Sequence, residues 1–181
     1  MELKEYIEET LEGCRETLYR TLQGLSQEEL VWRPNPETNS IAFIVWHMTR
    51  VEDVWVHRYA RGVAEVWVRD GWCGKFGLGE SDHGAGFSAE RLANFPTIAL
   101  SALKEYLDSV RQDTLNYLRG LDPEDFDSVP GRVIFPGAPA AAMERFKAFS
   151  VARMFRQLNG EEYQHVGHVG YLRGLQRGMN R

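Results

Sequence analysis

The feature that most constrains the fold is a set of four long segments in which apolar residues recur every three or four positions. This spacing places the apolar side chains along one face of an α-helix, as in the leucine-rich segment 3–24. The second and third segments span residues 41–61 and 97–121, and the fourth begins near 143–149 and ends near 177. Four amphipathic helices predict an all-α protein built as a four-helix bundle.

Length and composition limit the class of protein. A chain of 181 residues predicts one domain, residues 1–181. Its net charge of −5 argues against a nucleic-acid partner, which requires clustered basic residues. No signal peptide and no run long enough to cross a bilayer is found, so no membrane partner is expected. Two cysteines without motif spacing indicate a reducing compartment, and we expect the cytoplasm. Cys14 lies on the apolar face of its helix and is expected in the core.

A long irregular loop, residues 62–96, separates the second and third helices. It is rich in glycine, and loops of this length in compact domains are usually functional or mobile. Trp67, Trp72 and Phe76 are expected to cover one mouth of the core. Asp82 and His83 are interpreted as surface turn residues, with delivery of polar groups to a site as the alternative.

The chain before and within the fourth helix is also interrupted. Residues 122–142 are expected to be irregular, except for a short strand or extended strap at Arg132 to Phe135. Pro136, Gly137 and Pro139 would end that strap. Asn159 and Gly160 disfavour a helix, so a kink or a restart is predicted there.

Three metal-competent side chains lie close together near the C-terminus: Glu161, His165 and His168. At about 100° per residue, Glu161 and His165 differ by about 40° around a helix, and His165 and His168 by about 60°. All three therefore share one stripe, with apolar residues around it. Because burying such groups without partners costs several kcal/mol, a divalent metal is the simplest compensation.

A third ligand is sought elsewhere, and His47 is the candidate. It lies in the middle of the apolar stripe of the second helix, where a lone histidine is more often a hydrogen-bonded core residue. The need for one more inward ligand raises its weight. Glu52 or Asp53 could orient a ligand, but a solvated helix face is the preferred interpretation. His57 lies about 80° from His47 by helical rotation and is expected to be exposed.

His47, Glu161 and His165 would give three protein ligands and leave one coordination position open for water or a substrate thiolate. Zinc or nickel is expected first, with manganese or iron as alternatives, because two imidazoles and a carboxylate suit all four. His168 is the candidate catalytic residue; a fourth ligand and a polar neighbour of the site remain alternatives for it.

Four stretches of the chain resemble the DinB-like superfamily of metal-binding four-helix bundles, which includes thiol-dependent transferases and isomerases. They are the WRP of residues 32–34, NSIAFIVWHMTRVEDVW at 39–55, the loop at 76–96, and EEYQHVGHVGYLRGLQRG at 161–178. The family's second-helix histidine falls on His47. Its last-helix pair falls on Glu161 and His165, followed by Gly167. Many members have histidine at the first of these two positions and glutamine where this chain has His168.

The resemblance implies an up-down-down-up bundle of the DinB/YfiT-like type and a metal site. It also implies a low-molecular-weight thiol or another small molecule activated at the metal, as in an S-transferase acting on a small electrophile. Homodimers are common in the family, so a homodimer is expected.

A second hypothesis is that the chain keeps the bundle without the chemistry. Glu161 in place of histidine and His168 in place of glutamine also fit a non-catalytic binding or stress-response module with a degenerate or empty metal site. Hydrogen bonds among His47, Glu161, His165 and His168 would then satisfy the buried polar groups.

Overall fold

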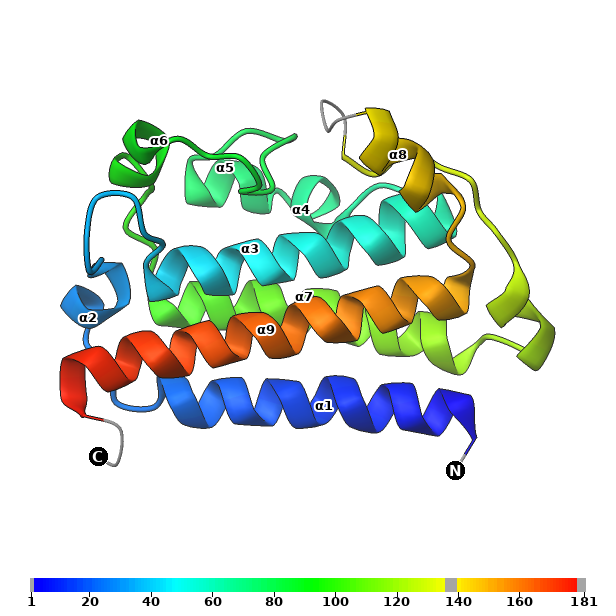
Figure 1. Ribbon diagram of the computed structural model, residues 1–181, viewed down its shortest axis with the longest axis horizontal. Coiled ribbons are helices and arrows are strands. Elements are labelled where there is room, and N and C mark those ends of the chain that lie inside the picture. Colours follow the sequence, from blue (N-terminus) through cyan, green and yellow to red (C-terminus); the bar gives the residue numbers. More distant parts are fainter. Residues whose placement is uncertain (1, 136–139, 179–181) are drawn as a thin grey trace.

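Four long helices form the body of the protein in the computed structural model, which describes residues 2–135 and 140–178. They are α1 (Leu3–Leu22), α3 (Ile41–Asp53), α7 (Leu100–Arg119) and α9 (Val151–Arg177), and they lie side by side in Figure 1. A π-helix, η1 (Val54–Arg61), follows α3 directly and extends it to residue 61. Helix α1 packs on α7 and α9, and α3 packs on the same two helices. The core therefore lies within a ring of four neighbouring helices.

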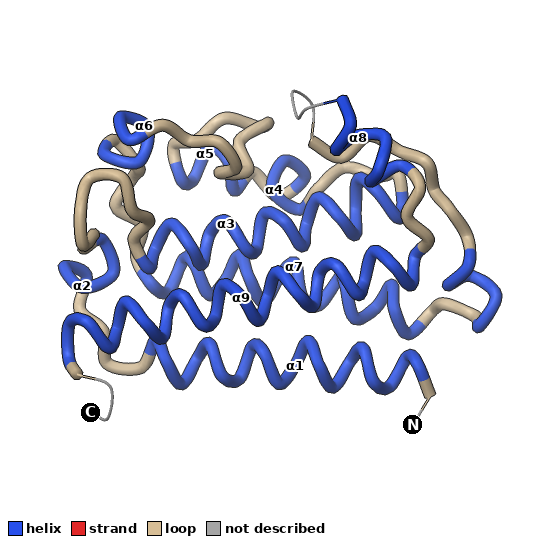
Figure 2. Tube along the Cα trace, viewed as in Figure 1, coloured by secondary structure: helices blue, strands red, loops and turns tan. Residues whose placement is uncertain are grey.

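The described residues contain helices and loops and no strand, as Figure 2 shows. The prediction of an all-α fold is confirmed. In Figure 1, α3 and α7 run in one direction, and α1 and α9 run in the other. None of the described helices is both long enough and apolar enough to cross a membrane.

Short helices fill the connections. They are α2 (Gln27–Val31), α4 (Val66–Arg69), α5 (Trp72–Phe76), α6 (Ala89–Ala93), the 3-10 helix η2 (Pro123–Asp127) and α8 (Ala140–Lys147). The segment with α4, α5 and α6 lies along the side of α3 that faces away from α9 (Figure 1). Trp67, Trp72 and Phe76 are buried there against Tyr106 of α7. Cys14 is fully buried as predicted, and burial raises the pKa of its thiol to about 12.

The central position of α3 shows that the predicted exposure of three polar residues is wrong. Every residue of α3 except His47 is buried, because other elements cover it on all sides. Glu52, Asp53 and His57 were assigned to a solvated face, yet they are 1%, 0% and 0% exposed. An ion-pair partner offsets the cost of burying each side chain: Arg111 for Glu52, Arg50 for Asp53, and Asp113 for His57.

The region before the last helix agrees with one of two alternatives and differs from a second expectation. Residues 132–135 form no strand; the segment is an irregular strap with Ile134 buried. Pro136, Gly137 and Pro139, predicted to end the strap, lie outside the described residues. The predicted fourth helix is two helices, since Ser150 caps a new start by accepting a hydrogen bond from the backbone N–H of Arg153. Helix α9 then continues through Asn159 and Gly160 without a restart.

Candidate metal centre

Two histidines meet where α3 packs on α9. The rings of His47 and His165 have centroids 5.1 Å apart and lie perpendicular to each other. His165 is buried, with 9% of its surface exposed, and His47 is half-buried. Helical packing thus brings together two predicted ligands that are far apart in the sequence.

Glu161 joins this pair from the preceding turn of α9. Its Oε2 lies 3.4 Å from Nε2 of His165, and its Oε1 accepts a hydrogen bond of 3.1 Å from the side chain of Gln157. The interaction with His165 lowers the pKa of the Glu161 carboxyl against the opposing effect of burial, and His47 lowers it further. Glu161 is therefore a carboxylate at neutral pH.

His47 is held by the loop that covers α3. Its Nδ1 donates a hydrogen bond to the backbone carbonyl of His83. Burial lowers the pKa of His47 to about 4, so the ring is neutral at pH 7. A neutral ring with a proton on Nδ1 has its lone pair on Nε2, the arrangement usual for a metal-ligating histidine.

The fit of a metal to these residues can be tested on the atoms themselves. Nδ1 of His165 is buried and has no hydrogen-bond partner among the described residues, which is costly unless something else binds there. Two imidazoles and one carboxylate are suitable donors for a borderline divalent ion. As the side chains stand, however, the part of the chain described here gathers no three His, Cys, Asp or Glu groups closely enough to hold an ion. The three side chains are of the right chemical type and lie near one another, so they fit a divalent ion. To bind it together, they would have to rotate toward one another.

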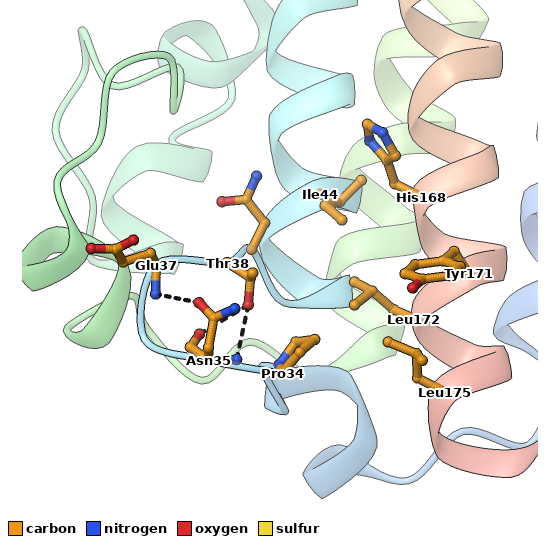
Figure 3. Close-up of a pocket in the computed structure, with 10 residues that line it drawn as sticks. Pro34, Asn35, Glu37, Thr38, Ile44, His168, Tyr171, Leu172 and Leu175 are labelled. Atoms are coloured by element: carbon orange, nitrogen blue, oxygen red, sulfur yellow. Dashed lines mark hydrogen bonds between the residues drawn. The ribbon is translucent and has the colours of Figure 1, made fainter.

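His168 lies one turn beyond His165 and is exposed, with the two ring centroids 5.5 Å apart. It lines a surface groove of about 480 Å³ between α9, the start of α3 and the loop before it. Figure 3 shows His168 and Ile44 at one end and Tyr171, Leu172 and Leu175 along α9. The groove is lined by Pro34, Asn35, Glu37, Thr38, Asn39, Ile44, His168, Tyr171, Leu172 and Leu175.

Sequence reasoning missed the buried charges that support this region. Arg50, 1% exposed, contacts Glu65 at 2.6 Å and Asp53 at 3.2 Å, and Glu162, next to Glu161, contacts Arg111 at 3.2 Å. The sequence does contain a pattern that indicates this burial. Apolar residues occur on every face of the segment 41–56, as expected for a helix that is buried on all sides. Charges on such a helix must be paired.

Asp82 and His83 do reach the site, although through their backbone. The carbonyl of His83 accepts from His47, and the carbonyl of Asp82 accepts from Nε of Arg50 at 2.9 Å. The interpretation of these two as surface turn residues was therefore incomplete, because a backbone contact leaves no pattern in side-chain chemistry.

The structure is thus that of an all-helical protein with a histidine pair and a carboxylate between two of its long helices. The chain belongs to the DinB superfamily, whose family model matches residues 10–169. A solved structure described as the conserved protein of locus from Enterococcus faecalis has a TM-score of 0.77, with 20% identity over 97% of each chain. At that identity the likeness shows the fold alone. A comparison with curated proteins gives no significant match.

Proposed function

We propose that the protein is a divalent-metal-dependent enzyme that acts on a small molecule, with thiol-dependent S-transfer to a small electrophile as its reaction. His47, Glu161 and His165 would hold the ion. The observation that carries this proposal is the position of His165 beside both other donors: the rings of the two histidines lie 5.1 Å apart, and Oε2 of Glu161 lies 3.4 Å from Nε2 of His165.

Zinc or nickel suits this donor set first, with manganese or iron as alternatives. A bound ion would favour the thiolate form of a bound thiol and so supply a nucleophile. The residues provide the remaining functions. Neutral His47 presents a lone pair, and carboxylate Glu161 balances part of the positive charge. His168 would take up or return a proton at the rim of the site, which is supported by its exposure and by the 5.5 Å between its ring centroid and that of His165.

The groove beside His168 supports a small-molecule substrate. Its volume of about 480 Å³ falls within the range usual for small-molecule sites. Ile44 and Leu172 give it an apolar wall, and Asn35 and Thr38 give it amide and hydroxyl groups on the opposite side (Figure 3). A small electrophile with an apolar body would lie there with its reactive end toward His168.

A second candidate function is a non-catalytic binding or stress-response module of the same fold. It is favoured by the absence, within the described parts of the chain, of three gathered donor groups. Glu161 is also already paired with His165 and Gln157. In this hypothesis the polar side chains stabilise one another and no ion binds.

Metal content separates the two functions. Untagged protein purified without chelator would be measured by elemental mass spectrometry beside His47→Ala and His165→Ala, with circular dichroism to confirm that each variant is helical. We expect near one divalent ion per chain in the native protein and a loss of the ion in both variants. Native protein that takes up no zinc, nickel, manganese or iron, even when offered, would favour the binding module.

Two structural expectations also belong to the proposal. The arrangement is the up-down-down-up bundle of the DinB/YfiT-like type, which the opposite directions of α1 and α9 relative to α3 and α7 support (Figure 1). The protein is a homodimer, which the exposed Tyr163, Tyr171 and Leu175 on α9 support, since exposed apolar side chains gather at interfaces. Sedimentation analysis would test the second expectation.

A further inference from the structure

The backbone of the loop over α3 comes unusually close to the ring of His47. Nδ1 of His47 donates to the carbonyl of His83. A carbonyl oxygen can only accept, so Nδ1 must carry the proton, and in a neutral imidazole Nε2 then has the lone pair. This contact therefore selects one of two tautomers of the ring.

Gly84 makes the approach possible. Its φ is +89°, and a Cβ atom there would lie 2.8 Å from Nδ1 of His47 and 3.0 Å from ring atoms of Phe43 and Trp46. Such distances are shorter than side chains tolerate, and all three neighbours are rings carried by α3. Any larger residue at position 84 would have to push the loop, with the His83 carbonyl, away from His47.

The loop is also fixed from within the core. Arg50, one turn after His47 on α3, donates from Nε to the carbonyl of Asp82 at 2.9 Å. Its guanidinium is 1% exposed and held by Glu65 at 2.6 Å and Asp53 at 3.2 Å. Two consecutive carbonyls, of Asp82 and His83, are thus bound by two side chains from consecutive turns of one helix.

We propose that the segment Asp82–Gly84 positions His47 by holding it as the Nδ1–H tautomer, and that Arg50 fixes this segment in place. The loop thereby leaves Nε2 of His47 available as a donor, while Phe43, whose ring is stacked on that of His47 at 5.9 Å, restrains the ring plane. The part of this inference that concerns metal binding by His47 rests on the proposed metal centre.

The first test reads the tautomer directly in metal-free protein. Long-range ¹⁵N–¹H correlation spectra of ¹⁵N-labelled wild type at pH 7 distinguish Nδ1–H from Nε2–H rings, and the His47 signals are those missing from His47→Ala. We expect His47 as Nδ1–H. An Nε2–H ring, or an equal mixture of tautomers, would overturn the proposal without any loop variant having to fold.

The second test compares two glycines of the same loop. Gly84→Ala should shift His47 toward a mixture of tautomers and weaken zinc binding by about 10–100-fold, the effect usual for a lost partner of a metal-ligating histidine. Gly86→Ala is the matched control, because Gly86 also has a positive φ, +75°, but nothing lies within 4 Å of its Cβ position. Gly86→Ala should keep the wild-type tautomer and affinity.

The two proposals fail in different ways. If Gly84→Ala keeps both the wild-type tautomer and the wild-type zinc affinity, the positioning role is rejected even though the metal centre stands. If the wild type binds no ion but His47 is Nδ1–H and responds to Gly84→Ala and not to Gly86→Ala, the positioning role is supported and the metal centre is rejected.

Discussion

His57 illustrates how individual buried residues in this protein depend on their charged neighbours. Its Nδ1 lies 2.9 Å from Oδ1 of Asp53, and its Nε2 lies 3.2 Å from Oδ2 of Asp113. Burial by itself opposes a charge on the ring, but the hydrogen bonds with the two carboxylates outweigh it and raise the pKa. The folded state therefore binds this proton more tightly than the unfolded state does.

We expect this proton to appear in the pH dependence of stability. Protonated His57 stabilises the fold fully below its unfolded pKa of about 6.5, and this contribution is lost as pH rises through the higher folded-state pKa. In His57→Gln the corresponding part of the decline should be missing. The measurement is the free energy of unfolding in urea at several pH values between 6 and 9.

The control for this prediction is His168→Gln, which removes an exposed histidine. It should keep the wild-type decline of stability with pH. If His57→Gln and wild type instead lose stability in parallel, then His57 is not the residue whose pKa is raised.

At the scale of the element, α9 combines a long helix with residues that disfavour one. It spans 27 residues and includes Asn159, Gly160, Gly167 and Gly170. Tertiary packing overrides this local weakness, since α1 and α3 both contact α9, and Phe155, Leu158 and Val169 of α9 are buried. The predicted restart therefore does not occur.

Gly160→Ala should stabilise the protein. A Cβ atom at position 160 meets nothing within 4 Å, and alanine in a helix interior is favoured over glycine by about 0.5–1 kcal/mol. A thermal melt and urea titration would measure the gain. Gly62→Ala provides the contrast, because a Cβ there would lie 2.7 Å from the Arg132 guanidinium at a positive φ of +67°, and it should destabilise. Equal effects of Gly160→Ala and Gly62→Ala on the free energy of unfolding would contradict this explanation of the two glycines.

At the scale of the whole molecule, one buried arginine joins all four long helices. Arg111 of α7 donates to both carboxylate oxygens of Glu52 on α3, at 2.8 and 2.9 Å, and to Glu162 on α9 at 3.2 Å. It also donates to the carbonyl of Leu11 on α1 at 2.5 Å. Burial raises the pKa of Glu162 to about 8, which Arg111 opposes.

Arg111→Met should destabilise the protein by about 3–5 kcal/mol, because it leaves the Glu52 carboxylate buried without its cation and removes the hydrogen bond to Glu162. Urea denaturation would measure this loss. Arg119→Met is the control on the same helix, because Arg119 pairs with Glu8 at the surface, at 2.5 Å. Its removal should leave the urea midpoint of unfolding almost unchanged. An effect of Arg111→Met as small as that of Arg119→Met would contradict this role of Arg111.

The sequence by itself determined three of the four long helices and the identity of the candidate donors. Apolar residues at three- and four-residue spacing predicted helices at 3–24, 41–61 and 97–121. The structure has α1 at Leu3–Leu22, α3 at Ile41–Asp53 continued by the π-helix Val54–Arg61, and α7 at Leu100–Arg119. The placing of Glu161 and His165 on one stripe of a helix follows from local geometry, so it too was predictable. Periodicity is a local property, and it can be read without knowing the neighbours.

Only the tertiary structure decided which polar residues are buried and what holds them. Glu52, Asp53 and His57 were expected to be solvated, but each is buried by a different neighbour. Glu52 pairs with Arg111 of α7, Asp53 accepts hydrogen bonds from the backbone of Val66 and Trp67, and His57 of η1 pairs with Asp113 of α7. The contact of His47 with the His83 carbonyl depends on backbone atoms that every residue shares, so no residue type announces it. Burial and backbone contacts depend on which segments meet in space, whereas a helical pattern depends only on the order of residues along the chain.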